Sequence, residues 1–196
     1  MTIPQLPFYF IRHGETDWNR GHVYMGTTDI PLNQTGVGQA ELAAQWLKDQ
    51  PITHIATSSL SRAVKTAKII AESIQKPITV IDNLKECHWG VKEGQPVDIC
   101  TFFDQWIDGD TPEGAEAACD FDARVKRGLI HALGLSKTVL IVAHGGVCCS
   151  IQRTLSLPLM NIKNCVPICY RPPEHPGHSW SVCGLGGEVK NNVVVN

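Results

Sequence analysis

FYFIRHGET, residues Phe8 to Thr16, joins an apolar, β-prone run to an Arg-His pair that a glycine follows at once. Aromatic and β-branched residues favour strands, so the run before Arg12 is expected to form a strand of a sheet. In open α/β sheets, ligands bind beyond the carboxyl ends of the strands, which is where Arg12 and His13 fall. By itself the triplet fits an ordinary strand exit as well as a binding site.

A second segment, residues 138–146, has the same design. Its sequence TVLIVAHGG is a β-branched run that ends in His144 and two glycines, with a helix-like stretch after it. Two strands are therefore expected to end in histidines at one edge of a sheet. A further cation, Arg62, falls in the first turn of a predicted helix, where it opposes the helix dipole unless both face one bound anion. An exposed arginine without a special partner is the plain alternative.

Strands and helices alternate along the chain. Helices are expected over about 35–50 with Thr35 as the cap, 62–76, 97–107, 116–133 and 147–155. Strands are expected over about 8–11, 52–57, 78–81, 138–143, 165–170, 179–185 and 189–195. This alternation predicts the α/β class: a three-layer α/β/α sandwich with a mostly parallel sheet and right-handed crossovers.

The length of 196 residues suits one domain over residues 1–196. From residue 83 to about 115 the pattern is irregular and broken by glycines and prolines. We expect a small lid insertion at about 87–115, because irregular segments of this kind commonly cover a site.

Charge and composition exclude several classes of protein. With 17 basic and 19 acidic side chains, the formal net charge is -2, so a nucleic-acid partner is not expected. No apolar stretch reaches transmembrane length, and residues 1–7 do not look like a signal peptide, so no membrane partner and a cytoplasmic location are expected.

The eight cysteines are expected to be free thiols, since disulfide frameworks belong to short secreted chains. Cys165 and Cys169, with His175 and His178 downstream, loosely resemble a zinc site. We disfavour it, because the residues between the two cysteines look like strand and no CxxC pair occurs. No metal site is therefore expected.

Two arginines and two histidines that converge on one point repel one another unless an anion lies between them. Phosphoryl groups fit best, because the guanidinium fork matches phosphate oxygens and their charge must be held through a loose transition state. A histidine with one neutral ring nitrogen can accept the phosphoryl group. The four side chains already supply positive charge, so neither a metal ion nor another cofactor is required.

A leaving alkoxide needs a proton, and the segment after the third predicted strand offers Glu86 and Glu93. A carboxyl group beside a phosphate dianion has its ionised form disfavoured, which suits a general acid. Glu86 is the better candidate by position, since Glu93 lies deeper in the lid and is expected to be solvated or structural.

Four ordered motifs resemble those of the histidine phosphatase superfamily, the phosphoglycerate mutase-like group. They are Arg12-His13-Gly14-Glu15-Thr16 with Trp18-Asn19, Ser59-Leu60-x-Arg62-Ala63-x-x-Thr66 as a helix start, Leu84-x-Glu86-x-x-x-Gly90-x-x-x-Gly94, and Ala143-His144-Gly145-Gly146. The likeness runs from about residue 8 to 155 and weakly on through Asn164-Cys165.

The resemblance implies a role for each matching residue. His13 is the nucleophile that forms a phosphohistidine, and Arg12, Arg62 and His144 complete the phosphate pocket. Asn19 matches an additional phosphate ligand, Gly26 a backbone donor near the substrate, and Glu86 the general acid that later activates water. For Glu15, Thr16 and Trp18 we prefer structural roles in the loop. The lid aromatics Trp89, Phe102, Phe103 and Trp106 fit either a core or a substrate pocket, and we favour the core.

The sequence departs from the family pattern in two places. In the segment Thr111 to Glu116, many relatives have Gly-Glu-Ser after the proline, and Ala115 and Glu116 here replace the last two of these residues. This difference concerns only the local structure of the lid or of a helix cap. Mutases that need bisphosphoglycerate have a longer insertion with extra basic residues, whereas here Lys92 alone lies in the expected lid. We therefore expect a phosphomonoesterase of the histidine acid phosphatase type, acting on a small phosphorylated metabolite. A phosphoglycerate mutase and a non-catalytic phospho-ligand module remain the alternatives.

Overall fold

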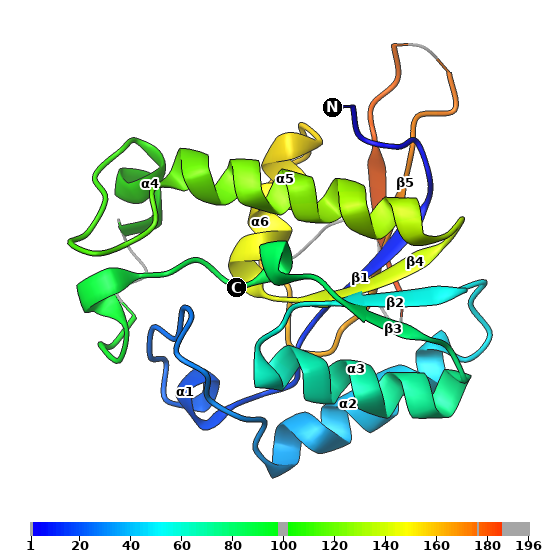
Figure 1. The fold of residues 1–196 in the computed structure, drawn as a ribbon, viewed down its shortest axis with the longest axis horizontal. Helices are drawn as coiled ribbons and strands as arrows, with labels where there is room; N and C mark the ends of the chain where they lie inside the picture. The colour runs from blue at the N-terminus through cyan, green and yellow to red at the C-terminus, as the bar shows by residue number, and fades with distance from the viewer. Residues whose placement is uncertain (1, 98–101, 176, 186–196) are drawn as a thin grey trace.

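The computed structural model describes residues 2–97, 102–175 and 177–185 (Figure 1). The predicted strand over 189–195 lies outside these residues, as does the start of the predicted helix over 97–107. None of the helices in the described ranges is long and apolar enough to cross a membrane.

One six-stranded sheet forms the centre of the molecule, with the strand order β3-β2-β4-β1-β5-β6. The strands are β1 (Phe8–Arg12), β2 (His54–Thr57), β3 (Ile78–Val80), β4 (Val139–Ala143), β5 (Ile168–Arg171) and β6 (Ser181–Gly184). The strands β1 to β4 run parallel to one another, whereas β5 pairs antiparallel with both β1 and β6. The predicted mostly parallel sheet is confirmed.

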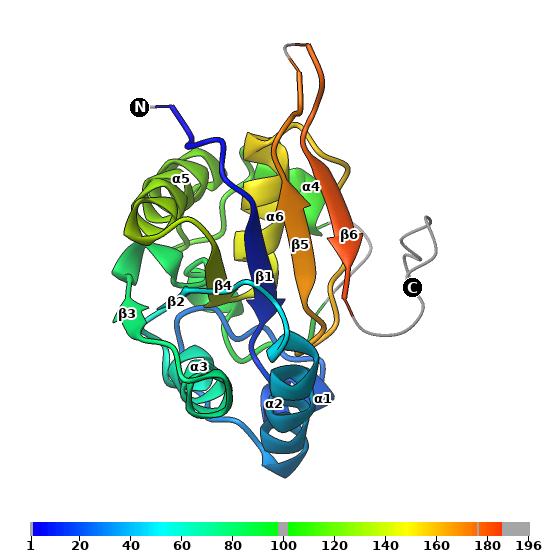
Figure 2. The ribbon, with the colours of Figure 1, turned by 90° about the vertical axis from the view of Figure 1, so that its right-hand side faces the viewer.

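Two pairs of helices cover the two faces of this sheet, α2 (Gln34–Leu47) with α3 (Ser61–Ile74), and α5 (Ala118–Leu135) with α6 (Gly145–Thr154) (Figure 2). Side chains of β1 alternate between the faces, as the pleat requires. Phe8 and Phe10 pack in the core under α5 and α6, whereas Tyr9 and Ile11 pack in the core under α2 and α3. These layers confirm the predicted α/β/α sandwich.

Some boundaries differ from the prediction because side chains compete to cap the helices. Asn33, not Thr35, caps α2, and its carboxamide oxygen accepts from the Gly36 backbone N–H at 2.9 Å. The helix α5 begins at Ala118 without a side-chain cap. A short helix α1 (Asp17–Arg20) inside the first loop has a reciprocal capping box between Thr16 and Asn19 that was not predicted.

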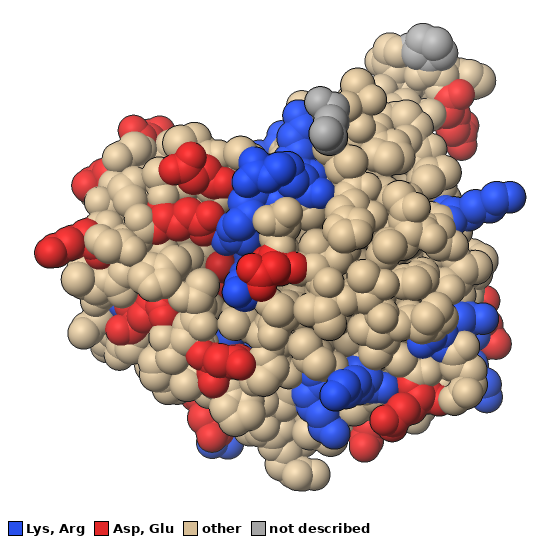
Figure 3. All heavy atoms as spheres, in the orientation of Figure 1, with Lys and Arg blue, Asp and Glu red and all other residues tan. Residues whose placement is uncertain are grey.

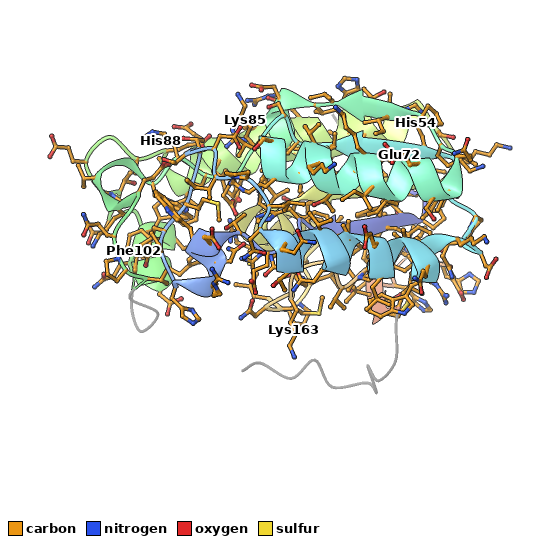
Figure 4. The ribbon with its side chains drawn as sticks, turned by 90° about the horizontal axis from the view of Figure 1, so that it is seen from below. His54, Glu72, Lys85, His88, Phe102 and Lys163 are labelled. Carbon is orange, nitrogen blue, oxygen red and sulfur yellow. The ribbon has the colours of Figure 1, made fainter. Side chains whose placement is uncertain are left out.

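Irregular chain covers one end of the sheet over the described residues 87–97 and 102–115, which we call the cover. It contains a 3-10 turn (Gly90–Lys92) and the short helix α4 (Phe102–Ile107). Figure 4 shows His88 and Phe102 of the cover at one end of the molecule and His54, at the start of β2, at the other. The cover therefore lies at the end of the sheet where the parallel strands finish.

The cover is held together by aromatic packing. Trp89 and Trp106 make an edge-on contact with ring centroids 4.9 Å apart, and Trp106 continues to Phe121 of α5 at 5.9 Å. Phe102 and Trp106 are buried, as the core interpretation predicted. Glu93 is structural, because its carboxylate accepts from the backbone N–H groups of Thr27, Thr28 and Trp89.

Candidate functional site

The structure brings His13 and His144 together at the carboxyl ends of adjacent parallel strands. Arg12 and Ala143 are paired across β1 and β4, so the next residue of each strand is a histidine. The backbone N–H of His13 donates to the carbonyl of Ala143 at 2.9 Å, and the two imidazole centroids lie 5.2 Å apart. The two-strand register therefore fixes the spacing of the rings.

One hydrogen bond defines the tautomer of His13. Its Nδ1 lies 2.7 Å from the carbonyl oxygen of Gly14, which can only accept, so Nδ1 carries the hydrogen. Within the described chain Nε2 forms no hydrogen bond, which leaves its lone pair for a ligand. Burial, and then the charges of Arg62 and Arg12, hold the pKa of His13 well below its ordinary value, so the ring is neutral near pH 7.

His144 is fully buried behind His13. Its Nε2 lies 2.8 Å from the hydroxyl of Ser58, and its buried Nδ1 has no hydrogen-bond partner in the described residues. Burial, followed by the nearby charge of Arg62, lowers the pKa of His144 well below its ordinary value. A buried polar atom without a partner is costly, which is typical of a position that a ligand satisfies.

The two predicted arginines are both at the site. Arg12 donates to the carbonyl of Ile162 at 3.3 Å, and the Nε atoms of Arg12 and Arg62 are buried without a partner in the described residues. Burial lowers the pKa of Arg12 from its ordinary value and that of Arg62 to about 10. Both guanidinium groups therefore stay charged at neutral pH.

Arg62 is locked in place by the loop after α1, which argues against the exposed alternative. Its side chain is 1% exposed and donates to the carbonyls of Thr28 at 2.9 Å and Gly26 at 2.7 Å. Gly26 has φ of +54°, a conformation that glycine adopts readily. The carbonyl of Gly26 thus orients Arg62, whereas the expected role of its N–H toward a substrate stays a prediction.

Glu86 lines the cavity beside the start of α6. Its carboxylate accepts from the backbone N–H of Cys87 at 3.0 Å and from that of Gly146, in the first turn of α6, at 3.0 Å. Asn19 also lines the cavity, and its carboxamide oxygen accepts from the Thr16 N–H at 3.2 Å. Because the oxygen of Asn19 accepts this hydrogen bond within the loop, the NH₂ group is left to donate to a ligand.

A cavity of about 540 Å³ lies over these residues. Arg12, His13, Asn19, Gly26, Arg62 and Glu86 line it. Of the sequence-predicted site residues, only His144 is not exposed in its lining, because it lies behind His13. We call Arg12, His13, Arg62 and His144 the floor of the cavity.

Three residues that support the floor were missed from the sequence. Ser58 holds His144, Asn164 donates from its NH₂ group to the carbonyl of His13 at 2.8 Å, and Arg124 donates to the carbonyls of Lys85 and Glu86 at 3.0 and 3.2 Å. The position of Ser58 directly after β2 is a usable signal. Asn164 and Arg124 come from distant segments, so no local pattern marks them.

The cysteines do not form a metal site in the described chain. The seven cysteines described are all free, and no group of three or more His, Cys, Asp or Glu residues is placed to hold a metal ion. Cys165 and Cys169 are buried beside the sheet core, whereas His175 and His178 lie in the loop between β5 and β6. The structure thus does not bring together the four residues of the zinc alternative.

The fold and the floor together define an α/β protein with a candidate phosphate-type anion site at its strand ends. The family model described as the histidine phosphatase superfamily (branch 1) matches residues 8–167. A protein of Serratia proteamaculans named probable phosphoglycerate mutase GpmB is 36% identical over 205 residues, which cover 96% of this chain and 94% of that protein.

Solved structures have the same fold as this chain. The mycobacterial glucosyl-3-phosphoglycerate phosphatase in complex with VO3 has a TM-score of 0.76 at 25% identity and covers 90% of this chain and 97% of its own. A putative alpha-ribazole-5'-P phosphatase of Escherichia coli has a TM-score of 0.77 at 22% identity, covering 98% and 100%, and shares the fold. The chain belongs to the histidine phosphatase superfamily.

Proposed function

We propose that this protein is a phosphomonoesterase that works without a metal ion and forms a phosphohistidine on His13. The observation that carries the proposal is the bond from His13 Nδ1–H to the Gly14 carbonyl, which directs the proton away from Nε2. A neutral, oriented imidazole with a low pKa is a competent nucleophile at neutral pH.

In the first step, Nε2 of His13 forms a bond to phosphorus while the bond from phosphorus to the ester oxygen breaks. In this proposal Arg12, Arg62, the Asn19 NH₂ group and Nδ1 of His144 donate to the phosphoryl oxygens, and the buried nitrogens without partners on both arginines and on His144 support these roles. Glu86 gives its proton to the leaving alcohol. In the second step Glu86 takes a proton from water, whose oxygen attacks phosphorus and releases inorganic phosphate and free His13.

The choice of water as the final acceptor rests on the charges in the cavity. Among the described residues that line it, Arg12 and Arg62 are the only lysines or arginines, and both belong to the floor. A second phosphate or a carboxylate on the substrate would therefore lie without a cationic partner. The phosphoglycerate mutase alternative is favoured by the name probable phosphoglycerate mutase GpmB, which the Serratia protein shares with relatives from Yersinia.

The direct test is to trap the covalent intermediate. Protein incubated with a ³²P-labelled monoester and quenched in base should retain label that acid removes, as a phosphoramidate does. The His13→Ala variant should lose both this label and roughly 10⁴-fold or more of kcat with 4-nitrophenyl phosphate. The matched control is His54→Ala, because His54 lies at the far end of β2 with Nε2 2.9 Å from the Thr79 hydroxyl.

Three outcomes would contradict the proposal. Equal labelling of the His13→Ala variant would refute the nucleophile, and loss of turnover in excess EDTA would refute the metal-independent mechanism. Rapid interconversion of phosphoglycerates that depends on 2,3-bisphosphoglycerate would favour the mutase. A wild-type protein that binds inorganic phosphate but turns over no monoester would favour the non-catalytic module.

A further inference from the structure

Above the floor, the cavity has an outer wall made of apolar side chains. It is built from the loop after β1, the cover and the segment before β5, through Trp18, Val23, Trp89, Phe103, Leu159 and Ile162. From this wall we infer the substrate class of the proposed phosphatase: monoesters whose alcohol is large, uncharged and carries an apolar ring. The inference rests on the proposed function for its catalytic step and on the wall for its specificity.

The first argument is the match between the wall and a ring. Trp89 and Phe103 have centroids 5.8 Å apart and planes inclined by 59°, so the two rings are tilted against each other and do not form two parallel plates. Aromatic rings prefer such offset or edge-on partners to a face-to-face sandwich. A ring on the alcohol can therefore pack against both residues, which a short polar chain cannot do.

The second argument is charge. Lys163 follows Ile162 in the chain but does not line the cavity, and Figure 4 shows its side chain projecting from the lower edge of the molecule. Lys92 of the cover lies over the Phe102 ring, 5.6 Å from its centroid. Neither lysine belongs to the wall, so a carboxylate or second phosphate on the alcohol would find no lysine or arginine there.

The cover itself adds repulsion for anionic alcohols. Its described part from Phe102 to residue 115 has acidic side chains and no lysine or arginine: Asp104, Asp108, Asp110 and Glu113. Figure 3 shows acidic side chains gathered over the part of the molecule where Figure 1 places α4. At physiological ionic strength such charges act over roughly 8 Å, which is enough to disfavour a second negative group near the cavity mouth.

The third argument is size and the scarcity of polar groups in the wall. A cavity of about 540 Å³ is of the size that encloses a drug-sized ligand rather than a three-carbon acid. Outside the floor, Asn19 and Glu86, the polar side chains of the described lining are few, chiefly His22, Tyr24, Asn161 and Cys149. A sugar with many hydroxyl groups would leave most of them without partners, so an apolar ring fits better than a sugar.

The test compares esters of primary alcohols, which have similar leaving groups. We expect kcat/KM for 2-phenylethyl phosphate to exceed that for ethyl phosphate by at least tenfold, and that for 3-phosphoglycerate and phosphoserine by more. The phosphonate 3-phenylpropylphosphonate should likewise have a Kd at least tenfold lower than propylphosphonate. This binding measurement tests the wall even if turnover is absent.

Leu159 offers a variant that reverses the preference, because it is 47% exposed and its replacement should not disturb the core. Leu159→Lys should lower kcat/KM for 2-phenylethyl phosphate and raise that for 3-phosphoglycerate, each at least fivefold. The matched control is Leu42→Lys, which changes an equally exposed leucine of α2 outside the cavity and should change neither value.

The outcomes separate the two proposals. Equal values for ethyl and 2-phenylethyl phosphate, equal Kd values for the two phosphonates, or a wild-type preference for 3-phosphoglycerate would overturn the substrate class while leaving the phosphatase intact. Failure to hydrolyse any monoester, 4-nitrophenyl phosphate included, would overturn the phosphatase. If 3-phenylpropylphosphonate still bound with a lower Kd than propylphosphonate, the inference would then describe the ligands that the cavity binds rather than its substrates.

Discussion

The floor of the cavity and its outer wall are built in opposite ways. The floor consists of buried polar side chains that the ends of β1 and β4 and the start of α3 hold in place, with defined partners such as the Gly26 carbonyl for Arg62. The wall consists of apolar side chains from three irregular segments, and Leu159 in it is nearly half exposed. Rigid elements thus carry the proposed chemistry, and loops carry the proposed choice of alcohol.

This difference predicts two kinds of mutational effect. Changes in the floor should affect every ester, because every ester has the same phosphoryl group. Changes in the wall should separate esters by their alcohols. Glu86 lies between the two regions, since it accepts from the N–H of Gly146 in α6 but comes from the segment that leads into the cover.

The largest effect in this comparison is expected for Glu86→Gln. Without a general acid, kcat/KM for 2-phenylethyl phosphate should fall by about 10² to 10⁴-fold, because its alkoxide leaves poorly. The value for 4-nitrophenyl phosphate should fall much less, since nitrophenolate leaves without a proton. Steady-state assays on both esters measure the split. Glu113→Gln, in an exposed glutamate of the cover, is the control and should show no split.

Equal losses on the two esters would contradict the role proposed for Glu86. They would mean that its charge supports the floor rather than the leaving alcohol. Glu86 would then belong to the floor and not to the boundary between floor and wall.

The floor could be predicted from the sequence because its residues directly follow strands or begin a helix. His13 and His144 end two β-branched runs, and parallel pairing necessarily brings such ends to one edge of the sheet. The supporting partner Asn164 comes from a distant segment, and its contact with the His13 carbonyl depends on how the chain returns into β5. No period or motif in the sequence encodes that contact.

The wall could not be predicted, since loops have no period that separates inward from outward side chains. Phe102 and Phe103 are adjacent in the sequence, yet Phe102 is buried in the core and Phe103 lines the cavity. The helix α4 turns successive side chains by about 100°, so the two rings point in different directions although both contact Trp89. That packing is a tertiary result that neither residue type determines.

A smaller effect is expected for Gly146→Ala, which tests whether the close contact between Gly146 and Glu86 holds the carboxylate in its working position. A Cβ atom at Gly146 would lie 2.4 Å from Oε1 of Glu86, so the carboxylate would have to move. We expect kcat/KM for 2-phenylethyl phosphate to fall about tenfold, while phosphonate Kd values stay within about twofold. Steady-state assays and calorimetry give both numbers.

The control for this variant is Gly134→Ala in α5, where a new Cβ would have no heavy atom within 4 Å. It should leave activity unchanged and stabilise the helix by roughly 0.5 to 1 kcal/mol. A Gly146→Ala protein with wild-type activity on the alkyl ester would show that the carboxylate of Glu86 can move without loss of function. Its close contact with Gly146 would then not be needed for activity.

The smallest expected effect concerns the stability of the floor against acid. Burial, first of all, lowers the pKa values of His13 and His144 well below 6.5, so the native protein resists protonation there while the unfolded chain does not. Below about pH 6.5 the unfolded state therefore binds more protons, and stability falls as the pH falls. Each histidine should contribute up to about 1.4 kcal/mol per pH unit, measured by urea unfolding between pH 7.5 and 5.5. His144→Gln should reduce this dependence. The same slope in the variant and the wild-type protein would mean that His144 takes up a proton in the native state, and the neutral state assigned to it in the floor would be wrong.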